Sequence, residues 1–164
     1  GRMEQVAVVP GQPLVLVDYA HTPDALEKAL LALRPLARQR GGALWVLAGC
    51  GGDRDPGKRP LMATVAEREA QHGVLTSDNP RTENPVAILD QMRTGLQRPA
   101  LARIEVDRAV AIAETVARAA ANDVVLIAGK GHEDYQEVMG VKTPFSDLAY
   151  ARAALDRRLG GRGA

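Results

Sequence analysis

The sequence has few of the residues that typify extracellular or nucleic-acid-binding proteins. Cys50 is the single cysteine among 164 residues, which excludes an intrachain disulfide and fits a reducing compartment. Aromatic residues make up only 3%, too few for the stacking surfaces that accompany nucleic-acid binding. Lysine and arginine number 21 against 20 acidic residues, a net charge of +1. No nucleic acid or other polyanion is therefore expected as a partner.

Long apolar runs are also missing. No run approaches the roughly 20 residues that a membrane-spanning helix needs, and the short first apolar stretch does not read as a signal peptide. We therefore expect a cytoplasmic protein without a membrane partner. The opening residues, Gly1-Arg2-Met3-Glu4, lack an initiator methionine, which suggests a piece of a longer protein. The length suits one domain, over residues 1–164, with a core of its own.

Short apolar runs alternate with helical patterns along the chain. The runs predict strands at 6–9, 14–17, 44–47, 74–75, 103–106 and 124–127, and a weaker strand or hairpin near 138–141. Continuous apolar strands are typical of burial on both faces, and their alternation with helices indicates a parallel sheet. The predicted fold class is α/β: a Rossmann-like, three-layer domain with a mainly parallel sheet of about six strands and helices on both faces.

Two helices carry more specific expectations. The first begins after its N-cap, Thr22, and Pro35 is expected to end or kink it. The fourth begins after Asp107 and is expected to bury Val110, Ala113 and Ala117 on one face.

The stretch from Thr76 to Thr82 is placed to bind a ligand. It follows the strand at 74–75, and open α/β sheets bind ligands at the carboxyl ends of their strands. Pro80 has a fixed φ and restricts the residue before it, so the turn can hold Asp78 and Arg81 in fixed directions. One anion and one guanidinium held close together suit a zwitterionic ligand.

The glycine-rich loop 49–59 matches neither of two common motifs. Arg54 stands where a dinucleotide fingerprint needs its third glycine, and Arg59 replaces the hydroxyl of a phosphate loop. Pro56 also removes an amide donor that a phosphate cradle uses. The sequence of this loop alone favours neither of two interpretations, a ligand-binding loop or an ordinary strand-to-helix turn with solvated charges.

Two more loops follow buried strands. Asp18-Tyr19-Ala20-His21 leads into a helix N-terminus that would attract an anion, although spacing alone favours local capping. Gly129-Lys130-Gly131-His132-Glu133 allows close backbone approach, and Glu133 could hold an ammonium; a flexible charged loop is the alternative. Three histidines without a tight carboxylate cluster argue against a metal site, and Cys50 reads as a buried small residue rather than a nucleophile. Four such loops on one sheet edge favour a shared site.

Together these blocks resemble the C-terminal domain of the Mur ligases, in particular of members that add meso-diaminopimelate. The blocks are residues 1–4 (GRME), 17–24 (VDYAHTPD), 49–60 (GCGGDRDPGKRP), 77–81 (SDNPR) and 128–136 (AGKGHEDYQ). The resemblance implies binding of meso-diaminopimelate by Arg54, Asp78, Asn79, Pro80, Arg81, Gly129 and Glu133. It implies a nucleotide-facing segment at Asp18, Tyr19 and His21.

The resemblance also implies an ATP-dependent acid–amino-acid ligase of peptidoglycan synthesis, in which the amino acid attacks an acyl phosphate of UDP-MurNAc-L-Ala-D-Glu. An N-terminal UDP-binding domain and a central ATPase domain, holding ATP and Mg²⁺, would lie outside these residues. No catalytic or metal-binding residue is expected here, and the isolated domain is expected to be inactive. The alternatives are the same reaction with ornithine or lysine, a non-catalytic nucleotide-binding α/β domain, and a structural module.

Overall fold

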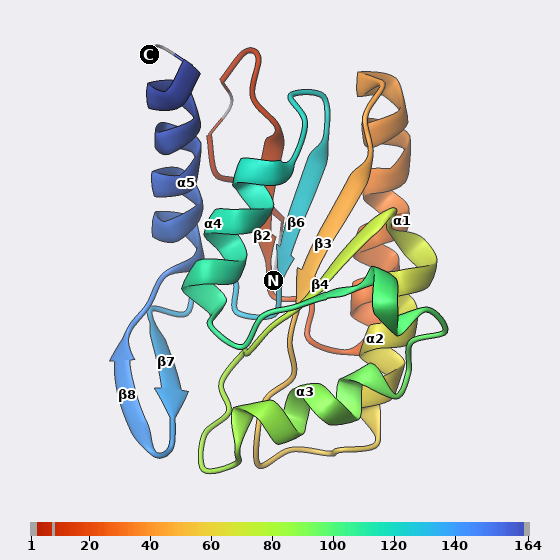
Figure 1. Cartoon of the computed structure of the whole chain (residues 1–164), viewed down its shortest axis with the longest axis vertical. Helices are drawn as coiled ribbons and strands as arrows, with labels where there is room; N and C mark the ends of the chain where they lie inside the picture. The colour runs from red at the N-terminus through yellow and green to blue at the C-terminus, as the bar shows by residue number, and fades with distance from the viewer. Residues whose placement is uncertain (1–2, 8, 163–164) are drawn as a thin grey trace.

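The computed structural model describes residues 3–7 and 9–162 (Figure 1). In chain order the elements are β1 (Glu4–Gln5), β2 (Leu14–Asp18), α1 (Pro23–Arg40), β3 (Leu44–Ala48), α2 (Lys58–Glu69), β4 (His72–Leu75), α3 (Pro85–Arg93), the 3₁₀ turn η1 (Pro99–Leu101), β5 (Arg103–Ile104), α4 (Arg108–Arg118), β6 (Val124–Ala128), β7 (Tyr135–Val138), β8 (Val141–Pro144) and α5 (Asp147–Arg162).

The main sheet has six strands in the order β1-β2-β6-β3-β4-β5. Strands β2 to β6 pair in parallel, and only β1 runs antiparallel, against β2. The predicted mainly parallel α/β sheet is therefore confirmed. Strands β7 and β8 form a separate antiparallel hairpin, which projects beside the carboxyl ends of the main strands (Figure 1).

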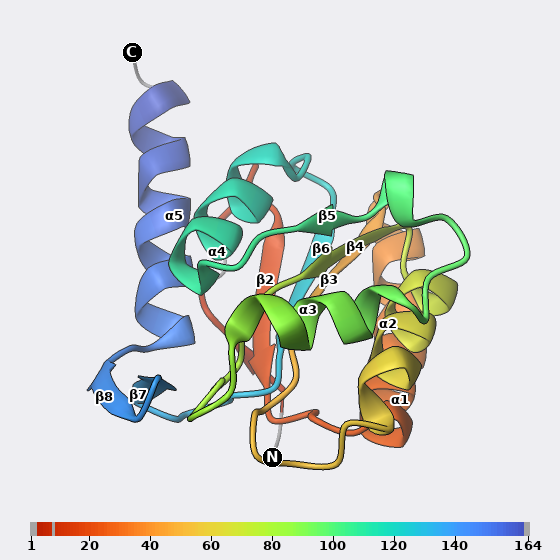
Figure 2. The ribbon, with the colours of Figure 1, turned by 60° about the horizontal axis from the view of Figure 1, so that its bottom comes forward.

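Helices cover both faces of the sheet, as a three-layer fold requires. Helices α1, α2 and α3 pack their apolar side chains on one face, against residues such as Leu16, Val46 and Leu126. Helices α4 and α5 pack on the other face, against residues such as Val125 and Ile127. Figure 2 shows α1 beside α2 on one flank and α4 beside α5 on the other. The central strands are buried on both sides, which explains their unbroken apolar sequences.

Three local expectations are corrected. The first strand lies at Glu4–Gln5 rather than 6–9, of which Val8 lies outside the described residues. Pro35 lies on the exposed side of α1, which continues to Arg40 because Leu33 and Ala37 are buried on either side of it. The strand expected at 103–106 is shorter, Arg103–Ile104.

Helix α4 also turns a different face to the core than expected. Its buried residues are Arg108, Ala111, Ile112, Thr115 and Val116. The three residues that were expected to face the core are half-buried or exposed. At 3.6 residues per turn the buried face lies nearly opposite the expected one, and it includes Arg108, whose guanidinium has specific partners inside the protein.

The amino-terminal edge of the sheet is fastened by Asp123. Its carboxylate accepts hydrogen bonds from Ala43 N, Ala120 N and Trp45 Nε1, each at 2.8 Å. Burial would raise the pKa of Asp123, but these hydrogen bonds outweigh it and lower the pKa. The Trp45 ring stacks on His72 with centroids 4.2 Å apart.

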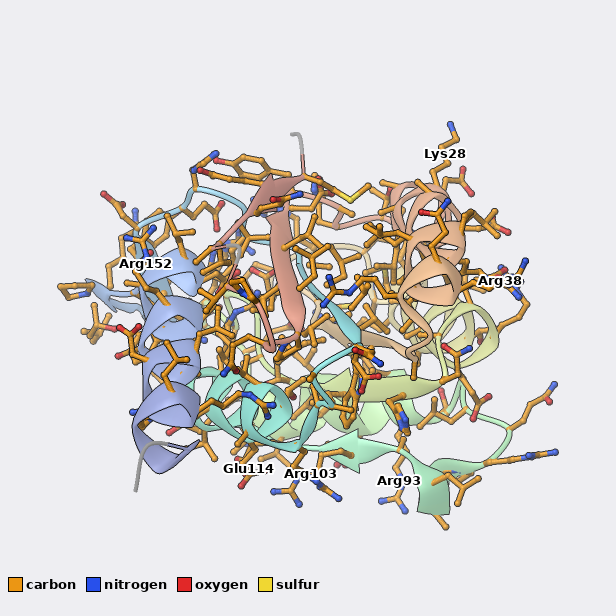
Figure 3. The ribbon with its side chains drawn as sticks, turned by 90° about the horizontal axis from the view of Figure 1, so that it is seen from above. Lys28, Arg38, Arg93, Arg103, Glu114 and Arg152 are labelled. Atoms are coloured by element: carbon orange, nitrogen blue, oxygen red, sulfur yellow. The ribbon has the colours of Figure 1, made fainter. Side chains whose placement is uncertain are left out.

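Charged side chains are dispersed around the outside of the molecule. In Figure 3, Lys28, Arg38 and Arg93 point outward at separate places, while Arg103 lies beside Glu114. Arg103 Nη2 and Glu114 Oε2 are 2.6 Å apart, and such exposed pairs contribute little to stability. Among the described helices, none is both long enough and apolar enough to cross a membrane.

Candidate functional site

The loops that follow β2, β3, β4 and β6 converge on one hollow at the carboxyl edge of the sheet. Its volume is about 440 Å³. All the residues predicted to bind a ligand line it, except Asp18 and Pro80. The lining residues are Tyr19, His21, Thr22, Gly49, Cys50, Gly51, Arg54, Asp55, Lys58, Met62, Asp78, Asn79, Arg81, Gly129 and Glu133.

The glycine-rich loop packs directly against the turn that carries Asp78 and Arg81. Gly52 N donates to Asn79 O at 2.8 Å, and a Cβ added at Gly52 would lie 1.8 Å from Pro80 O. No side chain fits in that space. The glycine is therefore needed for contact between two backbones, rather than for cradling a phosphate.

Side chains join the same two loops. Thr82 Oγ1 donates to Asp53 Oδ1 at 2.7 Å, and Asp53 N donates to Glu83 Oε2 at 3.1 Å. Arg59 is buried; it binds Glu83 and donates to Gly51 O at 3.0 Å. The Thr82 hydrogen bond lowers the pKa of Asp53, and the Arg59 hydrogen bond lowers that of Glu83. Arg59 stands where a phosphate loop would have a hydroxyl residue, and it instead joins the glycine-rich loop to the turn after β4.

Strand β7 holds the turn from the other side. Arg81 N donates to Glu137 O at 2.9 Å, and Gly140 N donates to Arg81 O at 3.1 Å. Gln136 Nε2 donates to Asp78 O at 2.8 Å. Arg81 has a φ of 53°, a left-handed conformation that is unfavourable for arginine and persists only when its surroundings fix it. The hairpin, and not Pro80 alone, therefore fixes the direction of the Arg81 side chain.

Two guanidinium groups line the hollow, and each has N–H donors beyond those used in the hydrogen bonds described below. Arg81 Nη1 donates to Gly52 O at 2.9 Å, and Arg54 Nη1 donates to Asp53 O at 3.0 Å. A Cβ at Gly51 would lie 2.6 Å from Arg81 Nη1, so the small residue leaves room for that side chain. Neither arginine forms an ion pair with another described residue. Both can therefore receive a carboxylate from a ligand.

Asp78 presents a buried carboxylate to the same hollow. Its side chain receives no hydrogen bond from the described part of the chain, and the residue is 7% exposed. Burial raises the pKa of Asp78, although the nearby charges of Arg108 and Lys130 oppose the rise. A Cβ at Gly129 would lie 2.4 Å from Asp78 Oδ2, so glycine is required beside it. A carboxylate without donors in such a place favours a cationic ligand.

Glu133 is held by one of its two oxygens. Its Oε1 accepts from Asn79 Nδ2 at 3.2 Å and lies 3.3 Å from Lys130 Nζ. Lys130 also donates to Asn79 Oδ1 at 3.0 Å, and its side chain is completely buried. The other oxygen, Oε2, accepts no hydrogen bond from the described residues and is therefore able to receive a ligand. Sequence reasoning missed Lys130; its only signal is a lysine between two glycines after a buried strand.

Tyr19 and His21 reach the hollow from the end of β2. His21 Nδ1 lies 2.7 Å from Tyr19 O, so the ring has a local partner, as spacing suggested. The Asp18 carboxylate accepts from Ala20 N at 2.8 Å and is also used locally. A Cβ at Gly131 would lie 2.4 Å from the Tyr19 ring. The ring is therefore packed in place at the rim of the hollow.

Cys50 lines the hollow but is poorly suited to nucleophilic chemistry. Burial, and to a lesser degree the charge of Asp78, raises the pKa of its thiol to about 12. The thiol is therefore protonated at neutral pH. Among the described residues, no group of three His, Cys, Asp or Glu side chains is placed to hold a metal ion.

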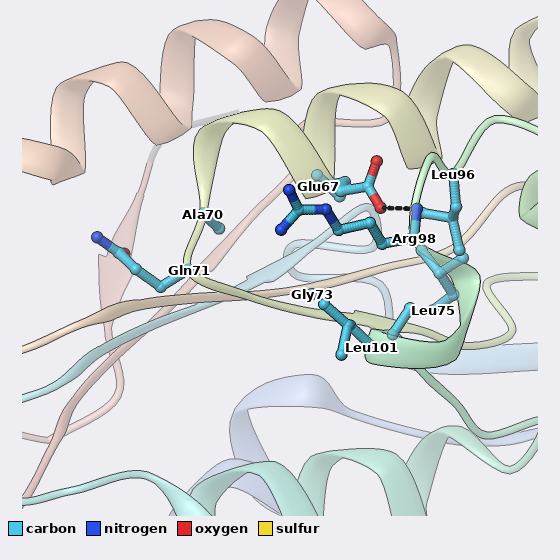
Figure 4. Close-up of a pocket in the computed structure, with 10 residues that line it drawn as sticks. Glu67, Ala70, Gln71, Gly73, Leu75, Leu96, Arg98 and Leu101 are labelled. Atoms are coloured by element: carbon cyan, nitrogen blue, oxygen red, sulfur yellow. Dashed lines mark hydrogen bonds between the residues drawn. The ribbon is translucent and has the colours of Figure 1, made fainter.

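A second hollow of about 160 Å³ lies beside β4 and is also lined by residues of α2 and η1 (Figure 4). Its acidic residue, Glu67, accepts from the backbone N–H groups of Gln97 at 2.8 Å and Arg98 at 3.0 Å. The charge of Glu67 is thereby satisfied within the protein. Leu75 and Leu101 supply apolar lining, and Gln71 and Arg98 also line it, but none of the residues predicted to bind a ligand does.

Comparison with known families assigns this architecture. The family model of the Mur ligase, glutamate ligase domain, matches residues 1–131. The chain belongs to the Mur ligase family. Two curated relatives of this Mur ligase domain are UDP-N-acetylmuramoyl-L-alanyl-D-glutamate–2,6-diaminopimelate ligases. The protein from Acidovorax sp. (strain JS42) is 64% identical over 98% of this chain, and that from Ralstonia nicotianae is 58% identical over 96%.

Solved structures agree with this assignment. A structure of a UDP-N-acetylmuramoyl-L-alanyl-D-glutamate–2,6-diaminopimelate ligase matches with a TM-score of 0.86 and 44% identity, covering 97% of this chain and 32% of that one. A folylpolyglutamate synthase from Thermotoga maritima matches with a TM-score of 0.58 at 16% identity, which shows a shared fold only. The Mur ligase domain spans 32% and 30% of the lengths of the two curated relatives.

Proposed function

We propose that this chain is the amino-acid-binding C-terminal domain of an ATP-dependent ligase that adds meso-diaminopimelate to UDP-MurNAc-L-Ala-D-Glu in peptidoglycan synthesis. The observation that carries the proposal is the buried Asp78 carboxylate, which faces the hollow and receives no hydrogen bond from the residues that the structure describes. Arg54 and Arg81, neither of which forms an ion pair within residues 3–7 and 9–162, line the same hollow. The names of the relatives support the same reaction.

The charges of the hollow match those of diaminopimelate. This amino acid carries two amino groups and two carboxylates, and the lining of the hollow includes the carboxylates of Asp78 and Glu133 and the guanidinium groups of Arg54 and Arg81. Asp55 and Lys58 also line the hollow, and the Asp55 carboxylate accepts from Gly57 N at 2.9 Å. In this proposal Arg81 forms a forked pair with the distal carboxylate, and Arg54 binds the other. Asp78 and Glu133 hold the amino groups, while Gly129 and Asn79 complete the wall. Pro80 contributes through its backbone contact with Gly52.

The residues of this domain bind and orient the amino acid and none is proposed to react. Holding two reactants in register can replace several kcal/mol of the barrier, up to about 7–11 kcal/mol in favourable cases. ATP and Mg²⁺ would activate the D-glutamyl carboxylate within the N-terminal and central domains, with Asp18, Tyr19 and His21 on the side facing the nucleotide. The complete ligase would be a cytoplasmic enzyme.

Amino-acid competition in the complete ligase tests this proposal. Ligation with ATP and UDP-MurNAc-L-Ala-D-Glu is measured with meso-diaminopimelate, lysine and ornithine in turn. We expect diaminopimelate to be preferred, because lysine and ornithine leave Arg81 unpaired; a site built this way can reject such an analogue by on the order of 10⁴. Preference for ornithine or lysine would reassign the substrate. ATP binding by the isolated domain, without amino-acid binding, would favour the nucleotide-binding alternative.

A further inference from the structure

Arg108 lies behind the candidate site and is completely buried. Its Nε and Nη2 donate to the two carboxylate oxygens of Asp147, at 2.8 and 2.7 Å, in a forked pair. Burial would lower the pKa of Arg108, but the charge and hydrogen bonds of Asp147 outweigh it, and the pKa is raised. Arg108 is therefore a permanent cation at the start of α4.

The remaining donors of Arg108 bind two strand ends. Nη1 donates to Ser77 O at 3.0 Å, and Nη2 donates to Ala128 O at 3.1 Å. Ser77 follows the end of β4, and Ala128 is the last residue of β6. These strands are not neighbours, because β3 lies between them in the sheet. The sheet sets their spacing only through β3, which pairs with both strands, whereas the guanidinium bridges the two strand ends directly.

The two bound carbonyls immediately precede two residues of the hollow. Asp78 follows Ser77, and Gly129 follows Ala128. Asp78 and Gly129 are packed so closely that a Cβ at Gly129 would lie 2.4 Å from Asp78 Oδ2. A small change in the spacing of β4 and β6 would therefore move the carboxylate relative to this wall of the hollow.

A second path leads from the same ion pair to Arg81. Asp147 is the first residue of α5, which follows the hairpin β7–β8 closely. Strand β7 in turn holds the backbone of Arg81 through Glu137. The pair Arg108–Asp147 thus anchors one end of the segment that directs the Arg81 side chain.

We infer that Arg108 is a positioning residue for the amino-acid site, acting through the carbonyls of Ser77 and Ala128 and never touching the substrate. This inference rests on the proposed function. Stability alone does not call for such a residue, since replacing a buried ion pair by apolar residues of similar volume is often neutral or stabilising. The forked geometry fixes two strand ends at once, which a compact lysine ammonium cannot do.

The test compares three variants of the complete ligase with the wild type. Arg108→Lys keeps the charge and loses the fork, and the double variant Arg108→Met with Asp147→Leu removes the pair without leaving an unpaired charge. The control is Arg158→Met. Arg158 donates to Val116 O, Ala117 O and Ala119 O at the far end of α4, so its loss perturbs the same helix away from the hollow. The KM values for diaminopimelate, ATP and the UDP-dipeptide are measured separately.

We expect both Arg108 variants to raise the KM for diaminopimelate by on the order of 10- to 100-fold, with the other two KM values unchanged, because misplacement by about 1 Å has effects of this size. A merely structural role would reduce the amount of active enzyme, and therefore the apparent kcat, without raising the KM for diaminopimelate above the other two KM values. Arg158→Met should leave all three KM values unchanged.

Three results would overturn the inference: folded Arg108 variants with a wild-type KM for diaminopimelate, an equal rise in all three KM values, or failure of every Arg108 variant to fold, which would assign the residue to stability alone. Failure of the wild type to use diaminopimelate would instead overturn the proposed function, so the two failures are distinguishable.

Discussion

Asn79 Oδ1 accepts a hydrogen bond from Lys130 Nζ at 3.0 Å inside the protein, where the lysine side chain has no solvent exposure. The same oxygen accepts from Glu137 N at 3.0 Å. Asn79 Nδ2 then donates to Glu133. One amide side chain therefore joins the turn after β4, the loop after β6 and the hairpin, and its orientation is fixed by these partners.

Replacing Lys130 should weaken amino-acid binding. In Lys130→Met, Asn79 and Glu133 lose a common donor, and buried Asp78 loses a neighbouring cation. We expect the KM for diaminopimelate in the complete ligase to rise on the order of tenfold or more, since leaving a buried polar group without its partner costs about 1–3 kcal/mol. The control is Lys142→Met. Lys130 Nζ lies 5.4 Å from the centroid of the Tyr135 ring, and Lys142 Nζ lies 4.8 Å from the same centroid but on the exposed strand β8. A matching loss in Lys142→Met would contradict the role of Lys130.

Replacing Arg81 should change selectivity as well as affinity. Arg81→Ala removes the proposed partner of the distal carboxylate, which lysine lacks. We expect the KM for diaminopimelate to rise by about 10²-fold or more, and the preference over lysine to narrow, because the unpaired cation that rejects lysine is gone. Competition assays with both amino acids measure this, with Arg93→Ala, on the outward-pointing side of α3, as the control (Figure 3). Unchanged kinetics with both amino acids would rule out the assignment.

Asp78 should make stability depend on pH in a defined direction. Its pKa is raised in the folded protein, mainly by burial, so the folded state binds a proton more readily than the unfolded state. Stability is therefore lost as pH rises from the unfolded value, about 4, through the higher folded value. We expect Asp78→Asn, which cannot ionise, to gain stability relative to the wild type over this range while losing affinity for diaminopimelate. Denaturant unfolding at several pH values from 4.5 to 8 measures the difference; a gap that shrinks with rising pH would contradict it.

Gly52 should tolerate no side chain. The Cβ of Gly52→Ala would lie 1.8 Å from Pro80 O, so the glycine-rich loop and the turn must separate. We expect a loss of about 1–3 kcal/mol in unfolding free energy, the usual range for overpacking, together with a higher KM for diaminopimelate. Gly73→Ala is the matched control, since its added Cβ would lie within 4 Å of no described residue beyond its two chain neighbours. Equal stability of the two variants, measured by chemical denaturation, would contradict the close backbone contact.

Much of this architecture could be predicted from local patterns. Apolar runs located the central strands, and capping residues such as Thr22 and Asp107 marked helix starts, because both signals depend on neighbouring residues. The convergence of four loops followed from the common direction of parallel strands. The rigidity expected from Pro80 explains only part of how the Arg81 side chain is oriented. The rest comes from hydrogen bonds to β7, which could not be predicted because β7 lies far along the chain from that turn.

The buried cations were the least predictable part. Arg108 and Lys130 look like solvated charges in the sequence, and Arg108 was not counted toward the buried face of α4. Their burial depends on partners 39 and 51 residues away, at Asp147 and Asn79. No local periodicity encodes such a pairing. The residues that line the hollow could therefore be predicted better than the buried cations behind them.

The single tryptophan of the chain has a practical consequence for spectroscopy. Trp45 is fastened to Asp123 near the start of β3, and the hollow opens beyond the other end of that strand, roughly 13 Å away at about 3.3 Å per residue. Its emission should therefore change when the sheet comes apart and stay constant when an amino acid binds. The protein thus contains a fluorophore that reports on folding but not on whether an amino acid is bound in the hollow.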